Sequence, residues 1–179
     1  MRRFRTWLTR ALAVWGALSL LGLASLLAFL AYSFGPGNRL EVDQATVSDV
    51  RFVLNWCDLG DDRIKEVVHS YVSPRSGPGG SDYLDAYAIK ISHVGIQELT
   101  EAQGWYRADK LPAVVDAAIT FMGGWSHEIT WYPSEEELRT PDFYVYPWSI
   151  YTHGIHPASA QLIFVRPADK MVFYFSGNT

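Results

Sequence analysis

Side chains that could act as nucleophiles, bases or metal ligands are few and widely separated in this sequence. The densest group is His153 and His156, which stand three residues apart. Two imidazoles at this spacing can share a metal ion when the backbone is helical. Pro157 disfavours helical backbone at His156, and Gly154 weakens a helix further. We therefore expect a polar turn at this position and no metal site.

Cys57 is the single cysteine of the chain, so it cannot form an intramolecular disulfide. A lone thiol can act as a nucleophile when a histidine lies beside it in space. Cys57 directly follows Trp56, at the end of a predicted strand, where a small buried apolar side chain is common. We expect a structural role for this cysteine.

Complete catalytic motifs are missing from the sequence. There is no Gly-x-Ser-x-Gly nucleophile motif, no Gly-x-x-x-x-Gly-Lys phosphate loop and no dinucleotide-binding glycine motif. His127 and Glu128 begin a His-Glu-x-x-His zinc-protease pattern, but Trp131 stands where the second histidine is needed. The sequence therefore favours a non-catalytic domain without a cofactor. The open alternative is a membrane-anchored hydrolase that uses His153, His156 or Cys57 with a nearby carboxylate.

Aromatic side chains are concentrated between residues 105 and 151. Such rings bury much surface, stack on sugars and provide the centre of many protein interfaces. Most of them should lie in the core, whereas those beside Pro, Gly or charged residues are the better candidates for a binding surface. Together with the two histidines above, they make up the predicted binding residues: Trp105, Tyr132, Trp148, Tyr151, His153 and His156.

The amino-terminal fifth of the chain has the composition of a membrane anchor. Residues 1–10 contain four arginines, and residues 11–34 contain no charged residue. At about 1.5 Å per helical residue, this apolar segment reaches about 36 Å, enough to cross a hydrocarbon core of about 30 Å. The arginines predict a cytoplasmic tail at 1–10 and a signal-anchor helix at 11–34. A cleaved signal peptide is the rival interpretation, with residues 31–33 as a weak cleavage site.

The remainder of the chain forms a linker at 35–41 and one predicted exported domain at 42–179. From Arg39 onward there are 11 Lys and Arg against 19 Asp and Glu, so this part is acidic. An acidic surface argues against nucleic acid and anionic lipid headgroups as ligands of the domain. We expect a periplasmic or extracellular domain, tethered to the inner membrane through residues 11–34. Its expected partner is an envelope protein or glycan, and an inhibitor or immunity-like role would fit.

Hydrophobic periodicity predicts an α+β domain with a mainly antiparallel sheet covered by two or three helices. The last two strands, 161–165 and 171–175, are apolar on both faces and are joined by a Pro-containing turn, so we expect a central hairpin. Residues 73–80 should form an exposed loop rich in Gly and Pro. The other expected strands are 47–56, 82–92, 126–132 and 143–146, and the expected helices are 63–71, a helix capped by Asp109 and stopped at Gly123-Gly124, and a short helix after Ser134.

Overall fold

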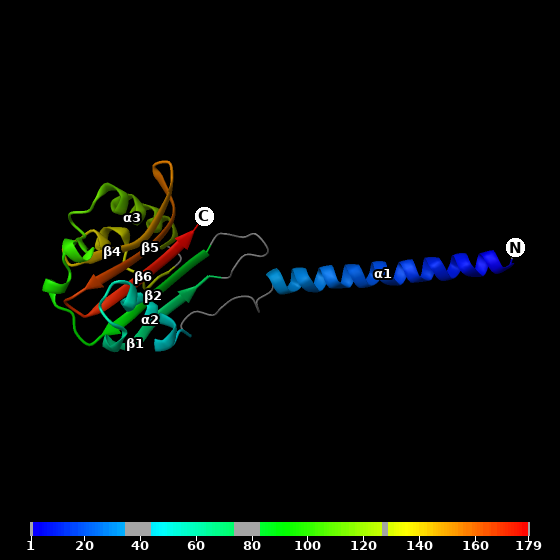
Figure 1. Cartoon of the computed structure of the whole chain (residues 1–179), viewed down its shortest axis with the longest axis horizontal. Helices are drawn as coiled ribbons and strands as arrows, with labels where there is room; N and C mark the ends of the chain where they lie inside the picture. Colours follow the sequence, from blue (N-terminus) through cyan, green and yellow to red (C-terminus); the bar gives the residue numbers. More distant parts are fainter. Residues whose placement is uncertain (1, 35–43, 74–82, 127–128, 179) are drawn as a thin grey trace.

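The structure, a computed structural model, describes residues 2–34, 44–73, 83–126 and 129–178. Its first element is the helix α1 (Arg2–Phe34), which is followed by an α+β domain (Figure 1). Within α1, the segment Leu12–Leu30 is long and apolar enough to cross a membrane, and no part of it is buried against the domain. The length and composition of this segment are those of a membrane span, and they are also those of a signal sequence.

The domain is built on a six-stranded sheet in which every neighbouring pair of strands is antiparallel. The strand order is β1-β2-β6-β5-β4-β3, so the last hairpin of the chain, β5–β6, lies at the centre as its two-sided apolar pattern predicts. The α+β class and the antiparallel sheet are confirmed. The strands are β1 (Ile64–Val72), β2 (Tyr83–Ile91), β3 (Tyr106–Arg107), β4 (Tyr144–His153), β5 (His156–Arg166) and β6 (Met171–Asn178).

Helices cover both faces of this sheet. On one face, α3 (Ala113–Ser126) and α4 (Glu135–Leu138) pack over β5 and β6 through residues such as Ile119, Met122 and Leu138. The helix α2 (Val47–Trp56) covers the other face (Figure 1), and its Val53 and Leu54 belong to a second core cluster with residues of β2, β5 and β6. Short 3-10 turns at Asp61–Arg63 (η2), Ile96–Glu98 (η3) and Glu101–Gln103 (η4) connect these elements.

Two predicted elements have the wrong type of secondary structure. Residues 47–56, predicted as a strand, form a helix, and residues 64–72, in the region predicted as a helix, form a strand. In α2, the backbone N–H of Thr46 donates to the Asp49 carboxylate at 2.7 Å, which fixes the helix start. Val50, Val53 and Leu54 then share one buried face at helical spacing. In the segment 63–71, the β-branched residues lie in an edge strand that pairs with β2.

The region between α3 and α4 also differs from the prediction. The α3 helix begins at Ala113 and continues through both glycines to Ser126, while Asp109 pairs with Arg107 and does not cap the helix. The expected strand 126–132 is absent from its described part, where the Tyr132 N–H donates to the Ile129 carbonyl in a turn. His127, Glu128 and the predicted loop from residue 74 onward lie outside the described residues.

The short helix after Ser134 is confirmed as α4. The Ser134 hydroxyl accepts from the Glu137 N–H at 3.2 Å, and the Glu137 carboxylate accepts from the Ser134 N–H at 2.8 Å. This reciprocal pair is the capping box that the Ser-x-x-Glu pattern predicts. Arg139 then joins α4 to α3 through ion pairs with Glu135 and Asp116.

Candidate functional site

The sheet face beneath α2 changes from apolar to polar along the central strands. Under α2, the directly paired residues Ile89, Val172 and Val165 form an apolar row across β2, β6 and β5. Four residues farther along each strand, toward the end of β6, the equivalent positions are Asp85, Ser176 and Gln161. Because strand side chains alternate between faces, these three polar side chains lie on the same face as the apolar row. They mark the part of this face that α2 leaves uncovered.

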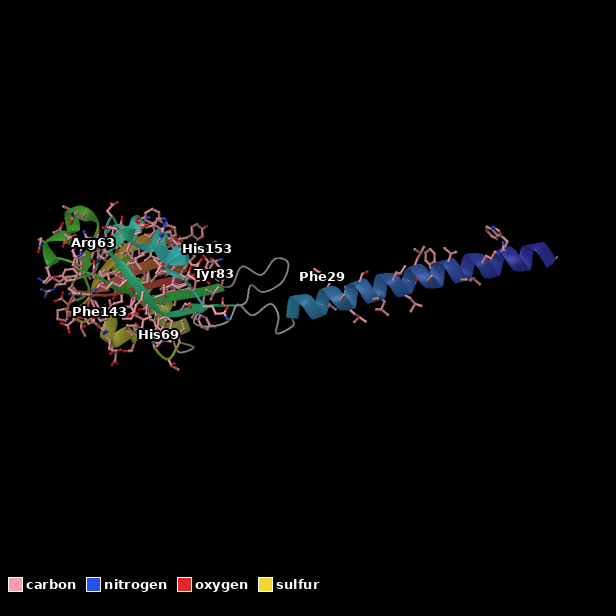
Figure 2. The ribbon with its side chains drawn as sticks, turned by 90° about the horizontal axis from the view of Figure 1, so that it is seen from below. Phe29, Arg63, His69, Tyr83, Phe143 and His153 are labelled. Atoms are coloured by element: carbon pink, nitrogen blue, oxygen red, sulfur yellow. The ribbon has the colours of Figure 1, made fainter. Side chains whose placement is uncertain are left out.

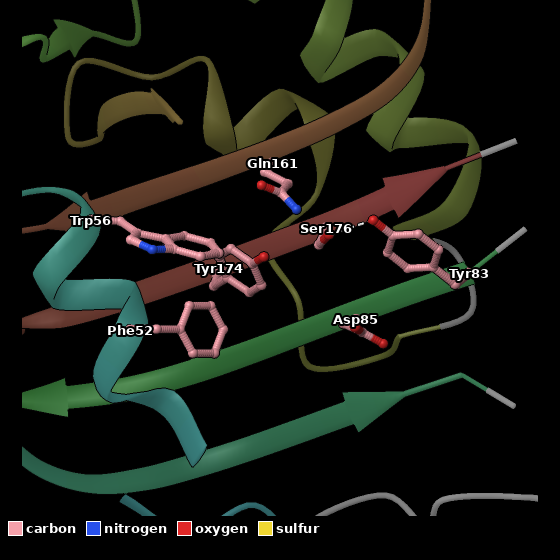
Figure 3. Close-up of a pocket in the computed structure, with 7 residues that line it drawn as sticks. All are labelled: Phe52, Trp56, Tyr83, Asp85, Gln161, Tyr174 and Ser176. Atoms are coloured by element: carbon pink, nitrogen blue, oxygen red, sulfur yellow. Dashed lines mark hydrogen bonds between the residues drawn. The ribbon is translucent and has the colours of Figure 1, made fainter. Parts of the chain in front are cut away.

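This uncovered part of the face forms an open cleft with a volume of about 400 Å³ (Figure 3). The polar row Asp85, Ser176 and Gln161 provides one part of its lining. Aromatic rings provide the rest. They are Phe52 and Trp56 from α2, Tyr174 from β6 and Tyr83 from β2.

Close ring packing holds the aromatic wall of the cleft in place. The ring centroids of Phe52 and Trp56 are 4.5 Å apart, and those of Phe52 and Tyr174 are 5.4 Å apart in an edge-on arrangement. Burial raises the pKa of the Tyr174 hydroxyl, which therefore stays protonated at neutral pH. The Ser176 hydroxyl donates to the Tyr83 hydroxyl at 3.3 Å. The cleft thus combines flat apolar surfaces with fixed hydrogen-bonding groups.

Four of the six predicted binding residues come together on the β4–β5 hairpin. His153 and His156 pair across the strands at its tip, where Gly154 adopts a φ of 67° in the turn. Trp148 and Tyr151 are exposed on β4. The Trp148 ring stacks on the ring of Trp56, with centroids 4.8 Å apart and planes inclined by 4°. The hairpin therefore borders the cleft through this pair of tryptophans.

The other two predicted binding residues lie in the core. Trp105 is 1% exposed and packs on the α2 face, and Tyr132 is 7% exposed and packs on the α3 face. Neither ring is available to a ligand in this structure. Their position beside Gly104 and Pro133 reflects chain turns next to the core. It does not place them on a surface.

Cys57, the thiol considered as a nucleophile, lies in the core of the domain. Cys57 is 2% exposed, and burial raises its pKa to about 12, so the reactive thiolate is scarce at neutral pH. Its thiol donates to the backbone carbonyls of Val53 and Leu54. Among the described residues, no three His, Cys, Asp or Glu side chains lie close enough to hold a metal ion.

The residues that line the cleft were not singled out from the sequence. Asp85, Gln161 and Ser176 belong to three strands, and their alignment depends on pairing registers that no short motif encodes. The sequence contains a partial signal in β5 and β6, where Gln161 precedes one apolar run and Ser176 follows the other.

Comparisons with other proteins do not place this chain in a family. No family model matches the sequence, and no curated protein and no solved structure shows significant similarity to it.

Proposed function

We propose that this protein is a membrane-anchored, non-catalytic binding module whose α2-face cleft binds a glycan of the cell envelope. In this proposal α1 spans the inner membrane with the four arginines in the cytoplasm, and the acidic domain lies in the periplasm or outside the cell. The observation that carries the binding role is the cleft itself, where a polar row from three strands faces an aromatic wall.

The chemistry of this lining suits a sugar. Aromatic rings like those that line the cleft can pack against the C–H surface of a pyranose ring. The Gln161 amide both donates and accepts hydrogen bonds, and the Asp85 carboxylate accepts them from hydroxyl groups. Ligand sites of this kind combine apolar walls with a few fixed polar groups. The domain is acidic and none of the described residues that line the cleft is basic, which favours a neutral ligand over an anionic one.

Titration of the full-length protein in lipid nanodiscs with neutral N-acetylglucosamine oligomers tests the proposal. We expect saturable binding, which Gln161→Ala weakens about 2- to 10-fold, the effect of one lost hydrogen bond. Gln97→Ala is the matched control, because Gln97 is exposed on η3 and does not line the cleft. Equal affinities of the two variants, or no saturable binding, would contradict a glycan site in the cleft.

A further inference from the structure

The tip of the β4–β5 hairpin exposes large apolar side chains. Ile155 in the turn is 84% exposed and Tyr151 is 63% exposed, while Trp148 lies farther along β4, beside Trp56, and is 43% exposed. Several large apolar side chains exposed on one hairpin mark an interaction surface more often than a single one does.

The hairpin is also uncharged, in contrast to the rest of the domain. No Asp, Glu, Lys or Arg occurs between residues 143 and 165, although the chain from Arg39 onward has 19 acidic and 11 basic residues. A surface near an anionic or zwitterionic lipid interface cannot carry many carboxylates without repulsion or desolvation cost. The hairpin is thus a charge-free, aromatic segment of an acidic domain.

The hairpin tip lies at a defined end of the sheet. Strand pairing aligns Tyr151 with Ser159, Asn178 and Tyr83 in one row, and the turn at 153–156 projects beyond that row. Figure 2 shows His153 and Tyr83 at the same end of the domain, with Arg63 and Phe143 at the other end.

The chain from α1 is long enough to bring this end to a membrane. The Ala45 N–H donates to the Ser70 hydroxyl, and Ser70 pairs with Tyr87, so the chain joins the domain near the middle of the strands. From that level to the hairpin tip is about 23 Å along the strand direction at about 3.3 Å per residue. The residues between Phe34 and Gln44 can span up to about 35 Å. The tether therefore permits contact between the tip and the bilayer surface.

We propose that the tip of the β4–β5 hairpin rests in the headgroup interface of the bilayer that holds α1. Tyr and Trp side chains favour this interface because their rings are apolar and their polar atoms remain hydrated. Ile155 adds an apolar side chain that would enter the acyl boundary. The contact would orient the domain and keep the cleft close to the membrane surface. This inference rests on the proposed membrane anchor but does not depend on the identity of the cleft ligand.

Site-specific fluorescence on the full-length protein tests the contact. Ile155→Cys and the control Ala168→Cys, which is exposed in the β5–β6 turn at the opposite end of the sheet, are labelled with the polarity-sensitive fluorophore NBD. The native Cys57 thiol is buried and should remain unlabelled in the folded protein. The labelled proteins are reconstituted into phosphatidylcholine vesicles with or without nitroxide-bearing lipids. We expect a blue-shifted emission that nitroxide lipids quench at position 155, and a solvent-like, unquenched emission at position 168.

Three outcomes are separable. If the protein floats with the vesicles but both labels show the emission of NBD in water, the proposed hairpin contact is wrong, whereas the membrane anchor is supported. A blue-shifted but unquenched label at 155 would indicate burial against protein and would also overturn the lipid contact. If the protein does not float with the vesicles, the anchor itself fails, and with it the premise of the contact.

Discussion

At the scale of single residues, the stacked pair Trp56 and Trp148 couples the helix α2 to the β4–β5 hairpin. The two rings lie nearly parallel, with centroids 4.8 Å apart. Aromatic pairs of this kind stabilise proteins by about 0.5–1.5 kcal/mol beyond their area burial. We therefore expect Trp148→Ala to lower the free energy of unfolding by about 1–2 kcal/mol, as measured by urea denaturation.

A matched substitution distinguishes the stability lost with the Trp56–Trp148 stack from the stability lost when any exposed aromatic ring is removed. Tyr151→Ala removes a more exposed aromatic residue from the same strand, with no described ring contact, and should change stability by less than about 0.5 kcal/mol. Equal losses in Trp148→Ala and Tyr151→Ala would show that the stack contributes no specific stability.

Glycine substitutions at two positions should have opposite signs. Gly104 has a φ of 86°, and a Cβ atom built there would lie 2.8 Å from the ring of Tyr146. Gly104→Ala should therefore lower the free energy of unfolding by about 1–3 kcal/mol through backbone strain and this close contact. Gly124, by contrast, lies in the α3 helix, and a Cβ atom there would meet no atom within 4 Å. Gly124→Ala should raise stability by up to about 1 kcal/mol through helix propensity. Urea denaturation of both variants checks the prediction, which fails if the two changes share a sign.

At the scale of elements, the junction between η2 and η3 should make domain stability dependent on pH. The Gly95 N–H donates to the Glu98 carboxylate at 2.9 Å, and Arg63 forms an ion pair with it at 2.6 Å. These two contacts, in that order of size, lower the pKa of Glu98 below its ordinary value. A lowered pKa means that the unfolded chain binds this proton first as pH falls. The stabilisation is complete above the unfolded pKa of about 4.3 and is lost as pH falls through the lower folded value.

The variant Glu98→Gln tests this dependence, because it keeps the side-chain shape but cannot ionise. Melting temperatures measured from pH 7 to pH 3 should fall less steeply for Glu98→Gln than for the unmodified protein. Glu101→Gln is the control, since Glu101 is exposed at the start of the turn η4. Equal slopes for the unmodified protein and Glu98→Gln would contradict the assignment.

The elements differ in how far their sequences determine them. The β5–β6 hairpin was predictable because its runs are apolar on both faces, which suits a central strand alone. The alternation of Val50, Phe52, Leu54 and Trp56 with mostly polar residues predicts a strand at 47–56. Val53 decides against that assignment, since alternation would place it with the polar residues, whereas it is fully buried. Short segments that fit both periods are resolved by tertiary packing, which the sequence pattern does not contain.

The residues of the candidate site also differ in how far the sequence predicts them. Local composition identified the exposed hairpin residues Trp148, Tyr151, His153 and His156, because a Gly- and Pro-containing turn keeps its neighbours near the surface. Local composition could not bring together Asp85, Gln161 and Ser176. Their shared row depends on the register of three strands that are distant in the chain.

At the scale of the whole molecule, the two parts of the chain have opposite requirements for their surroundings. The segment Leu12–Leu30 exposes apolar side chains on all sides, and the exposure of so much apolar surface to water is unfavourable. The sheet domain buries its apolar residues in two cores and carries the acidic residues of the chain. A bilayer beside water satisfies both requirements, and the arginines before the apolar segment predict which side each part occupies.

The proposed membrane anchor predicts a topology that expression of the full-length protein in a bacterial cell can test. A cysteine at the exposed position 168, introduced as Ala168→Cys, should react with a membrane-impermeant maleimide that reaches the periplasm of intact cells. The protein should also resist sodium carbonate extraction and retain its amino-terminal residues by mass spectrometry, because an uncleaved span of this length stays in the bilayer. Labelling that requires cell lysis would place the domain in the cytoplasm. A shortened, carbonate-soluble protein would instead identify the apolar segment as a cleaved signal peptide, and the hairpin would then have no membrane held within its reach.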